Sequence, residues 1–218
     1  MRISADVGGD ELWFEVPADT DLPGTVADSF AIMALAPSML RNEAVRIPPT
    51  IPISSTLAEN LTEAQKVLNC WNPAFRIVPV EAEVTPPAVS RDIEASMFSG
   101  GVDSLDTLMR HRDRIDESIL IGGFDMSVSH EQMDSARQRN AELTEHLGAR
   151  LRYIHTNQIA WGAKTGVSRR FWNSAYLAAA AILLRCRVVR IPSTHTYAML
   201  KPTGSHPVLD YLWSNGCT

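Results

Sequence analysis

The chain has 218 residues, 45% of them apolar, and a formal net charge of −5 at pH 7. This length allows a buried core in one large domain, or in one domain with a smaller unit attached. An acidic chain without a basic stripe argues against duplex nucleic acid as a partner, and the longest apolar run, residues 176–184, is too short to cross a membrane.

The three cysteines indicate the redox environment. Cys70, Cys186 and Cys217 lie far apart and form no Cys-x-x-Cys pair. We expect reduced thiols of a cytoplasmic protein, with Cys70 and Cys186 as small core residues because their neighbours are apolar.

Residues 1–84 predict a small α+β unit at the N-terminus. The expected elements are a strand at residues 12–16, a buried helix at 25–40, a short strand at 45–47, a helix from about 56 to 71 and an extended segment at 75–84. The last of these helices starts with Thr56 and Glu59 at capping-box spacing, followed by apolar residues every three or four positions. The proline-rich residues 85–92 are expected to link this unit to the rest of the chain.

From residue 93 onward strands and helices alternate, which predicts an α/β domain with a doubly wound, mostly parallel sheet over residues 93–218. The expected strands are residues 93–98, 118–124, 151–156 and 187–192, and the expected helices are 105–112, 129–147 and 170–184. Gly148 stands where the longest helix should stop in a left-handed conformation.

A hexapeptide between the first of these strands and its helix carries most of the functional information. Its sequence is Ser99-Gly100-Gly101-Val102-Asp103-Ser104. A glycine pair at a strand-to-helix turn lets backbone N–H groups point outward, and the helix N-terminus adds a partial positive charge, so the turn is suited to bind an anion. The two serine hydroxyls are further donors, and Asp103 supplies a carboxylate suited to a phosphate-bound Mg²⁺. The alternative interpretation of Gly100-Gly101 is a plain tight turn.

The pattern Ser-Gly-Gly-x-Asp-Ser resembles the PP-loop of the N-type ATP pyrophosphatases, in the adenine nucleotide alpha hydrolase-like superfamily. Members include GMP synthetase, NAD synthetase, asparagine synthetase, argininosuccinate synthetase and 7-cyano-7-deazaguanine synthase. The resemblance implies a Rossmann-like fold and cleavage of ATP between its α and β phosphates. AMP is transferred to an oxygen of a second substrate, pyrophosphate leaves, and a nitrogen or sulfur nucleophile then displaces AMP. It also implies that Phe98 and the hexapeptide bind ATP, with Asp103 holding Mg²⁺.

In an open parallel sheet, ligands lie beyond the carboxyl ends of the strands. By position in the family, Gly123, Phe124 and Asp125 after the second strand would border the adenosine. The alternative for Gly122-Gly123 is close packing of a helix on the strand.

Two further strand ends carry candidate residues. Ser193 and His195 follow the fourth strand and are candidates for a substrate pocket, with His195 as a possible base. His155, at the end of the third strand, is more simply explained as a residue facing solvent.

Residues 201–214 fit neither a helix nor a strand pattern. They resemble a Gly-Ser-His-Pro-Leu-Leu-Asp-Pro-Leu-Trp-Ser stretch of uncharacterised PP-loop proteins related to 7-cyano-7-deazaguanine synthase, which also share the Gly-Phe-Asp after the second strand. Val208 and Tyr211 depart from that stretch. His206 and Asp210 are therefore candidates for contact with substrate, the alternative being a surface loop.

Those relatives continue through a second half with a Cys-rich, metal-binding-like cluster, whereas this sequence ends at Thr218. The resemblance leaves three alternatives: a second polypeptide supplies that half, the protein works differently, or it has lost catalysis. It also implies a lysine that helps to hold the outgoing pyrophosphate, for which Lys164 and Lys201 are the only candidates in the second half of the chain.

Three functional hypotheses follow. The first is a ligase-like enzyme that uses ATP and Mg²⁺ to adenylate an oxygen of a small-molecule or peptide acceptor, releasing pyrophosphate. The second is a non-catalytic ATP-binding subunit that completes its site, or regulates, through a partner; a homo-oligomer is also left open. The third is a reductase or sulfur-transfer relative, against which the lack of a reactive cysteine pair near the loop argues.

Overall fold

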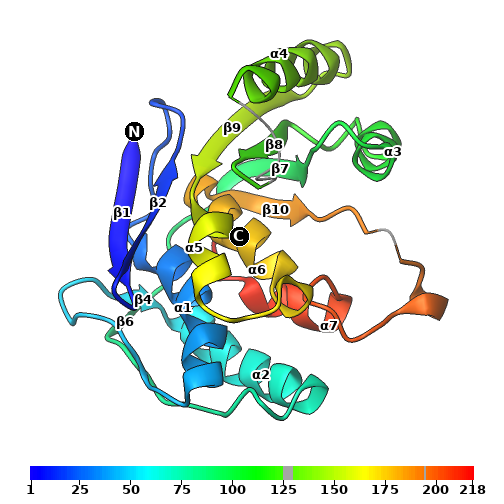
Figure 1. Ribbon diagram of the computed structural model, residues 1–218. Coiled ribbons are helices and arrows are strands. Elements are labelled where there is room, and N and C mark those ends of the chain that lie inside the picture. Colours follow the sequence, from blue (N-terminus) through cyan, green and yellow to red (C-terminus); the bar gives the residue numbers. More distant parts are fainter. Residues whose placement is uncertain (125–129, 194) are drawn as a thin grey trace.

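The computed structural model describes residues 1–124, 130–193 and 195–218 and has an α/β fold around a mixed six-stranded sheet (Figure 1). The sheet order is β1-β2-β9-β8-β7-β10, with β1 at Arg2–Val7, β2 at Asp10–Glu15, β7 at Arg91–Met97, β8 at Glu117–Gly122, β9 at Arg150–Thr156 and β10 at Cys186–Arg190. The strands β9, β8, β7 and β10 are parallel to one another, whereas β1 and β2 form an antiparallel hairpin that joins β9.

Helices and short strands complete the fold. The helices are α1 (Ala27–Arg41), α2 (Ser55–Trp71), α3 (Val102–Arg110), α4 (His130–His146), α5 (Gln158–Lys164), α6 (Asn173–Ala181) and α7 (Pro207–Asp210). Two small parallel pairs lie outside the main sheet: β3 (Val45–Arg46) with β5 (Val80–Glu81), and β4 (Ile53–Ser54) with β6 (Val84–Thr85). Within the described ranges, no helix combines the length and apolarity that a membrane span needs.

Both faces of the parallel strands are covered. The helices α3 and α4 lie on one side of the sheet, and α1, α5 and α6 lie on the other (Figure 1). Ile119 and Ile121 of β8 belong to the larger buried cluster, together with α1 and α6, whereas Phe98 packs in a smaller cluster with Leu108 of α3. Every residue of β8 is buried, including the polar Glu117 and Ser118. Burial on both faces explains why its apolar residues 119–121 are consecutive rather than alternating.

The N-terminal hairpin extends the same sheet. Glu15 of β2 pairs with His155 of β9, and Leu12 and Phe14 lie in the same buried cluster as Ile154. The strand at residues 12–16 was predicted, but β1 was not. The division of the chain at residues 85–92 stays a prediction.

Several elements differ from those expected from the sequence. The predicted loop before residue 170 contains α5, and the predicted helix 170–184 consists of α6 between two 3₁₀ turns, Arg169–Phe171 and Ile182–Leu184. Residues 201–214 include α7 and a 3₁₀ turn, Tyr211–Trp213. These pieces are too short to show a helical period in sequence. The helix stop at Gly148 is confirmed, with φ at 86°.

The cysteines were predicted only in part. Cys186 is buried as expected, and burial raises the pKa of its thiol to about 12. Cys70 was expected in the core, but it is exposed, because it lies on the side of α2 that faces away from the buried Leu57, Leu61 and Leu68.

Candidate functional site

The hexapeptide forms the turn from β7 into α3, as the sequence predicted. Gly101 is the N-cap residue of α3, with extended backbone angles. Gly100 has a left-handed φ of 79°, and a Cβ there would lie 2.6 Å from Oδ1 of the buried Asn140 on α4. Position 100 therefore requires glycine for its backbone conformation and for the space around it.

The two serine hydroxyls close the loop on itself. The Ser99 N–H donates to Oγ of Ser104 (3.3 Å), and the Gly101 N–H donates to Oγ of Ser99 (3.3 Å). The Ser104 hydroxyl donates to the Gly101 carbonyl (2.8 Å). Sequence reasoning assigned these hydroxyls to a ligand, but in this structure they first hold the turn in shape.

Three donors of the first turn of α3 are left for a ligand. The backbone N–H groups of Val102, Asp103 and Ser104 have no acceptor among the described residues. They are orphan donors of a helix N-terminus, where the helix dipole also favours negative charge.

A cavity of about 590 Å³ opens beside the loop. Its lining combines the loop (Phe98, Ser99, Gly101, Val102, Asp103, Ser104) with β7 and β8 (Met97, Ile119, Leu120, Ile121), with α4 (Met133, Ala136, Asn140), and with Phe124, Arg169, Leu177 and Pro192. Apolar walls with a few converging polar groups are typical of small-molecule sites of this size. Asn140, Met133 and Leu177 carried no signal in the sequence that linked them to the loop.

Arg169 is the one basic side chain among the described residues that line this cavity. Its guanidinium donates to the Phe124 carbonyl (Nη2 to O, 3.2 Å) and lies 4.5 Å from the centroid of the Phe124 ring. The family resemblance implied a lysine for the pyrophosphate, and no signal in the sequence pointed to Arg169. Lys164 instead pairs with Asp10 of β2, and the exposed Lys201 does not line the cavity.

Asp103 lines the cavity from the first turn of α3 and is exposed. The described part of the chain contains no cluster of three or more His, Cys, Asp or Glu side chains suited to a metal. The residues therefore fit a Mg²⁺ held by one carboxylate and by the phosphates of a ligand, rather than a site built from protein groups alone.

The residues predicted to border adenosine follow β8 but do not all line the same cavity. Phe124 lines the cavity, whereas Gly123 lines a neighbouring cleft, and Asp125 lies outside the described residues. Gly123 has φ at 81°, and a Cβ there would lie 2.1 Å from the Thr156 carbonyl of β9. Close packing therefore explains Gly122 and Gly123, as the alternative interpretation expected. The element packed against them is the strand β9 rather than a helix.

The four remaining candidates lie near the end of β10 and α7. Ser193, His195 and Asp210 line a separate cavity of about 410 Å³, which His206 does not line. His206 caps α7: its Nδ1 accepts from the Val208 N–H (3.1 Å), and its own N–H donates to Oδ1 of Asp210 (3.0 Å). Burial raises the pKa of Asp210. In this structure the contacts of His206 and Asp210 hold the start of a helix.

Neither protein-family models, nor curated proteins, nor solved structures give a match. The function is therefore inferred from the residues and their geometry.

Proposed function

We propose that this protein binds ATP in the 590 Å³ cavity and transfers AMP to an oxygen of a small-molecule or peptide acceptor. The observation that carries the proposal is the glycine turn at Gly100, which places the orphan N–H groups of α3 at the wall of a mostly apolar cavity. A helix N-terminus of this kind suits phosphate. The apolar wall formed by β8 and Phe124 suits the adenosine.

The strand order supports the same placement. The parallel strands follow the order third, second, first, fourth (β9, β8, β7, β10), so the chain reverses its winding direction between β7 and β10. We infer a doubly wound, Rossmann-like arrangement. The loop after β7 then lies at the switch point, where ligands of such sheets bind.

Each group of the cavity has a role in this reaction. The acceptor oxygen forms a bond to the α phosphorus, the bond from this phosphorus to the bridging oxygen breaks, and the electron pair leaves with pyrophosphate. The N–H groups of α3 and the Arg169 guanidinium stabilise the charge that grows on the leaving group. A Mg²⁺ held by Asp103 would neutralise further phosphate charge.

The test compares Arg169→Gln with Arg170→Gln, since Arg170 neighbours it in sequence but does not line the cavity. ATP affinity is measured by calorimetry, and AMP and pyrophosphate are measured with candidate acceptors. Loss of one charge-assisted contact should weaken ATP binding about tenfold or more in Arg169→Gln only. Equal affinities in both variants, or no binding of ATP by the unmodified protein, would contradict the proposal.

A second candidate function is favoured by the composition of the cavity. Its only titratable lining residues among those described are Asp103 and Arg169. If Asp103 holds Mg²⁺, no carboxylate or histidine of the described lining is left to accept a proton. A non-catalytic ATP-binding subunit fits this lining. In that case ATP raises the melting temperature, yet AMP forms only when a partner protein is added.

A further inference from the structure

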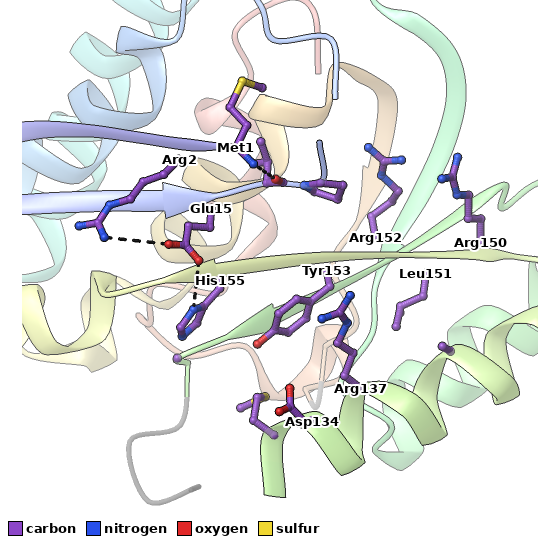
Figure 2. Close-up of a pocket in the computed structure, with 15 residues that line it drawn as sticks. Met1, Arg2, Glu15, Asp134, Arg137, Arg150, Leu151, Arg152, Tyr153 and His155 are labelled. Atoms are coloured by element: carbon purple, nitrogen blue, oxygen red, sulfur yellow. Dashed lines mark hydrogen bonds and ion pairs between the residues drawn. The ribbon is translucent and has the colours of Figure 1, made fainter. Parts of the chain in front are cut away.

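A second cleft, of about 780 Å³, lies between β9, the end of β2 and α4 (Figure 2). Tyr153 and His155 of β9 point toward α4, whereas Arg150 and Arg152 point to the opposite side of the strand (Figure 2). Arg137 of α4 reaches over the Tyr153 ring, with its guanidinium carbon 4.8 Å from the ring centroid.

Along this cleft, part of the β9 edge has no strand partner among the residues that the structure describes. Pairing of β2 with β9 is limited to residues Phe14 and Glu15, opposite Thr156 and His155. The Arg150 N–H donates to the Asp116 carbonyl (2.9 Å), on the β8 side. Because successive peptide groups of a strand alternate in direction, the N–H groups of Leu151 and Tyr153 point to the other edge, which faces the cleft.

Most cations around the cleft already have a partner. Arg2 pairs with Glu11 (3.1 Å), and Arg150 and Arg152 both pair with Asp19 (2.9 Å each). Arg137, in contrast, forms no ion pair with any residue that the structure describes, and it is exposed. One guanidinium is therefore available for an anion.

A second donor stands beside it. The Tyr153 hydroxyl lies where the side chain of residue 122 would be, because a Cβ on Gly122 would lie 2.0 Å from it. Burial raises the pKa of Tyr153, so its hydroxyl keeps its proton near neutral pH and can donate. The Arg137 guanidinium and the Tyr153 phenol thus lie together on the α4 side of β9.

The cleft adjoins the proposed nucleotide cavity. Met133 lines both, and the consecutive residues Gly123 and Phe124 line one each. A molecule held in the cleft is therefore close to a nucleotide held by the loop.

We propose that this cleft binds the anionic group, a carboxylate or a phosphate, of a small molecule through Arg137 and the Tyr153 hydroxyl, and that this molecule is the acceptor of the reaction. The second clause rests on the proposed function; the anion site itself does not. The anionic group serves as a handle, and a different oxygen of the molecule attacks ATP.

The experiment is calorimetric titration of the full chain with inorganic phosphate and, separately, with citrate at low ionic strength. Arg137→Gln is compared with Arg139→Gln, two positions along α4, where Arg139 bonds Ser135 and does not line the cleft. At least one probe should bind, and its affinity should fall about tenfold or more in Arg137→Gln and stay unchanged in Arg139→Gln. Tyr153→Phe should give a smaller loss. The probe that binds with the higher affinity shows whether the site prefers a phosphate or a carboxylate.

Several results would overturn the inference. They are the binding of neither probe, equal affinities in Arg137→Gln and Arg139→Gln, or a loss of anion binding in Arg169→Gln instead, which would place the anion in the nucleotide cavity. ATP and the probe should bind together, and mutual displacement would contradict the acceptor role. If ATP does not bind while the Arg137 dependence holds, the proposed function fails and the anion site stands.

Discussion

Gly100 meets two separate demands of the loop, and this makes it the most restrictive residue of the candidate site. A left-handed backbone costs a non-glycine residue about 1–2 kcal/mol, and a Cβ would also press on the Asn140 side chain at 2.6 Å. The hexapeptide pattern indicated a turn here, but the contact with Asn140, forty positions away, could not be read from sequence.

We therefore expect Gly100→Ala to lower the free energy of unfolding by about 1–3 kcal/mol and to abolish ATP binding, because the loop must change shape. Urea unfolding and ATP calorimetry measure the two effects. Gly24→Ala is the control, since a Cβ there meets nothing within 4 Å. Addition of Asn140→Ala to Gly100→Ala should restore part of the stability, since it removes the contact but not the backbone cost. Equal stability of Gly100→Ala and Gly24→Ala would contradict the argument.

Asn215 joins the C-terminal residues to α1 through buried hydrogen bonds. Its Nδ2 donates to the buried Asp28 carboxylate of α1 (2.9 Å), and its Oδ1 accepts from the N–H groups of Cys217 (3.0 Å) and Thr218 (2.9 Å). We expect Asn215→Ala to lower the free energy of unfolding by about 1–3 kcal/mol, because buried donors lose their acceptor. Urea unfolding tests this, with the exposed Gln138→Ala as control. A loss no larger than that of the control would show that the buried network contributes little.

At the scale of elements, β7 and β10 are joined by charge as well as by hydrogen bonds. The nearly buried Glu94 of β7 lies 2.6 Å from Arg190 and 3.0 Å from Arg187, both on β10, and 3.6 Å from Arg114. The hydrogen bond from Arg190 is the main cause that lowers the pKa of Glu94. This cluster joins the neighbouring strands β7 and β10 by ion pairs in addition to their backbone hydrogen bonds.

A lowered carboxyl pKa stabilises the folded state above the unfolded value and loses that effect as pH falls through the folded value. The stability of the unmodified protein should therefore exceed that of Glu94→Gln at pH 7, and the difference should shrink as pH falls below the ordinary value of 4.5. Urea unfolding at a series of pH values measures it. Asp106→Asn is the matched control, because its pair with Arg110 is exposed. A difference that does not change with pH would disprove the linkage.

The elements also show what the sequence can predict. The sequence predicted β8 and α4, and each predicted end lies within two residues of the observed one. By contrast, α5 has seven residues and α7 has four, too few for a helical period to be visible. The same limit applies to the site. The loop is one continuous stretch of sequence and was predicted. Arg169 reaches the cavity beside the loop, and Arg137 reaches the neighbouring cleft, only because the fold brings distant segments together.

At the scale of the whole molecule, the N-terminal residues and the α/β part share one core. Leu12 and Phe14 of β2 are fully buried in the cluster that also contains Ile154 and Trp161. The amino group of Met1 donates to the Val16 carbonyl (2.8 Å). This hydrogen bond joins the two ends of the hairpin opposite its turn. The hairpin also supplies one wall of the 780 Å³ cleft for which anion binding is proposed, here called the anion cleft.

We therefore expect unfolding in a single cooperative transition, because neither part can keep its apolar face buried without the other. Far-ultraviolet circular dichroism and tryptophan fluorescence should give the same urea midpoint, although the first reports on backbone structure and the second on packing around the tryptophans. A fragment of residues 85–218 should fail to fold, as it would expose the β9 edge and the apolar face that β2 covers. Two separated transitions, or a folded fragment, would instead support two units divided at residues 85–92. In that case the anion cleft, whose wall includes Arg2 and Glu15, would depend on how the units dock rather than on one continuous core.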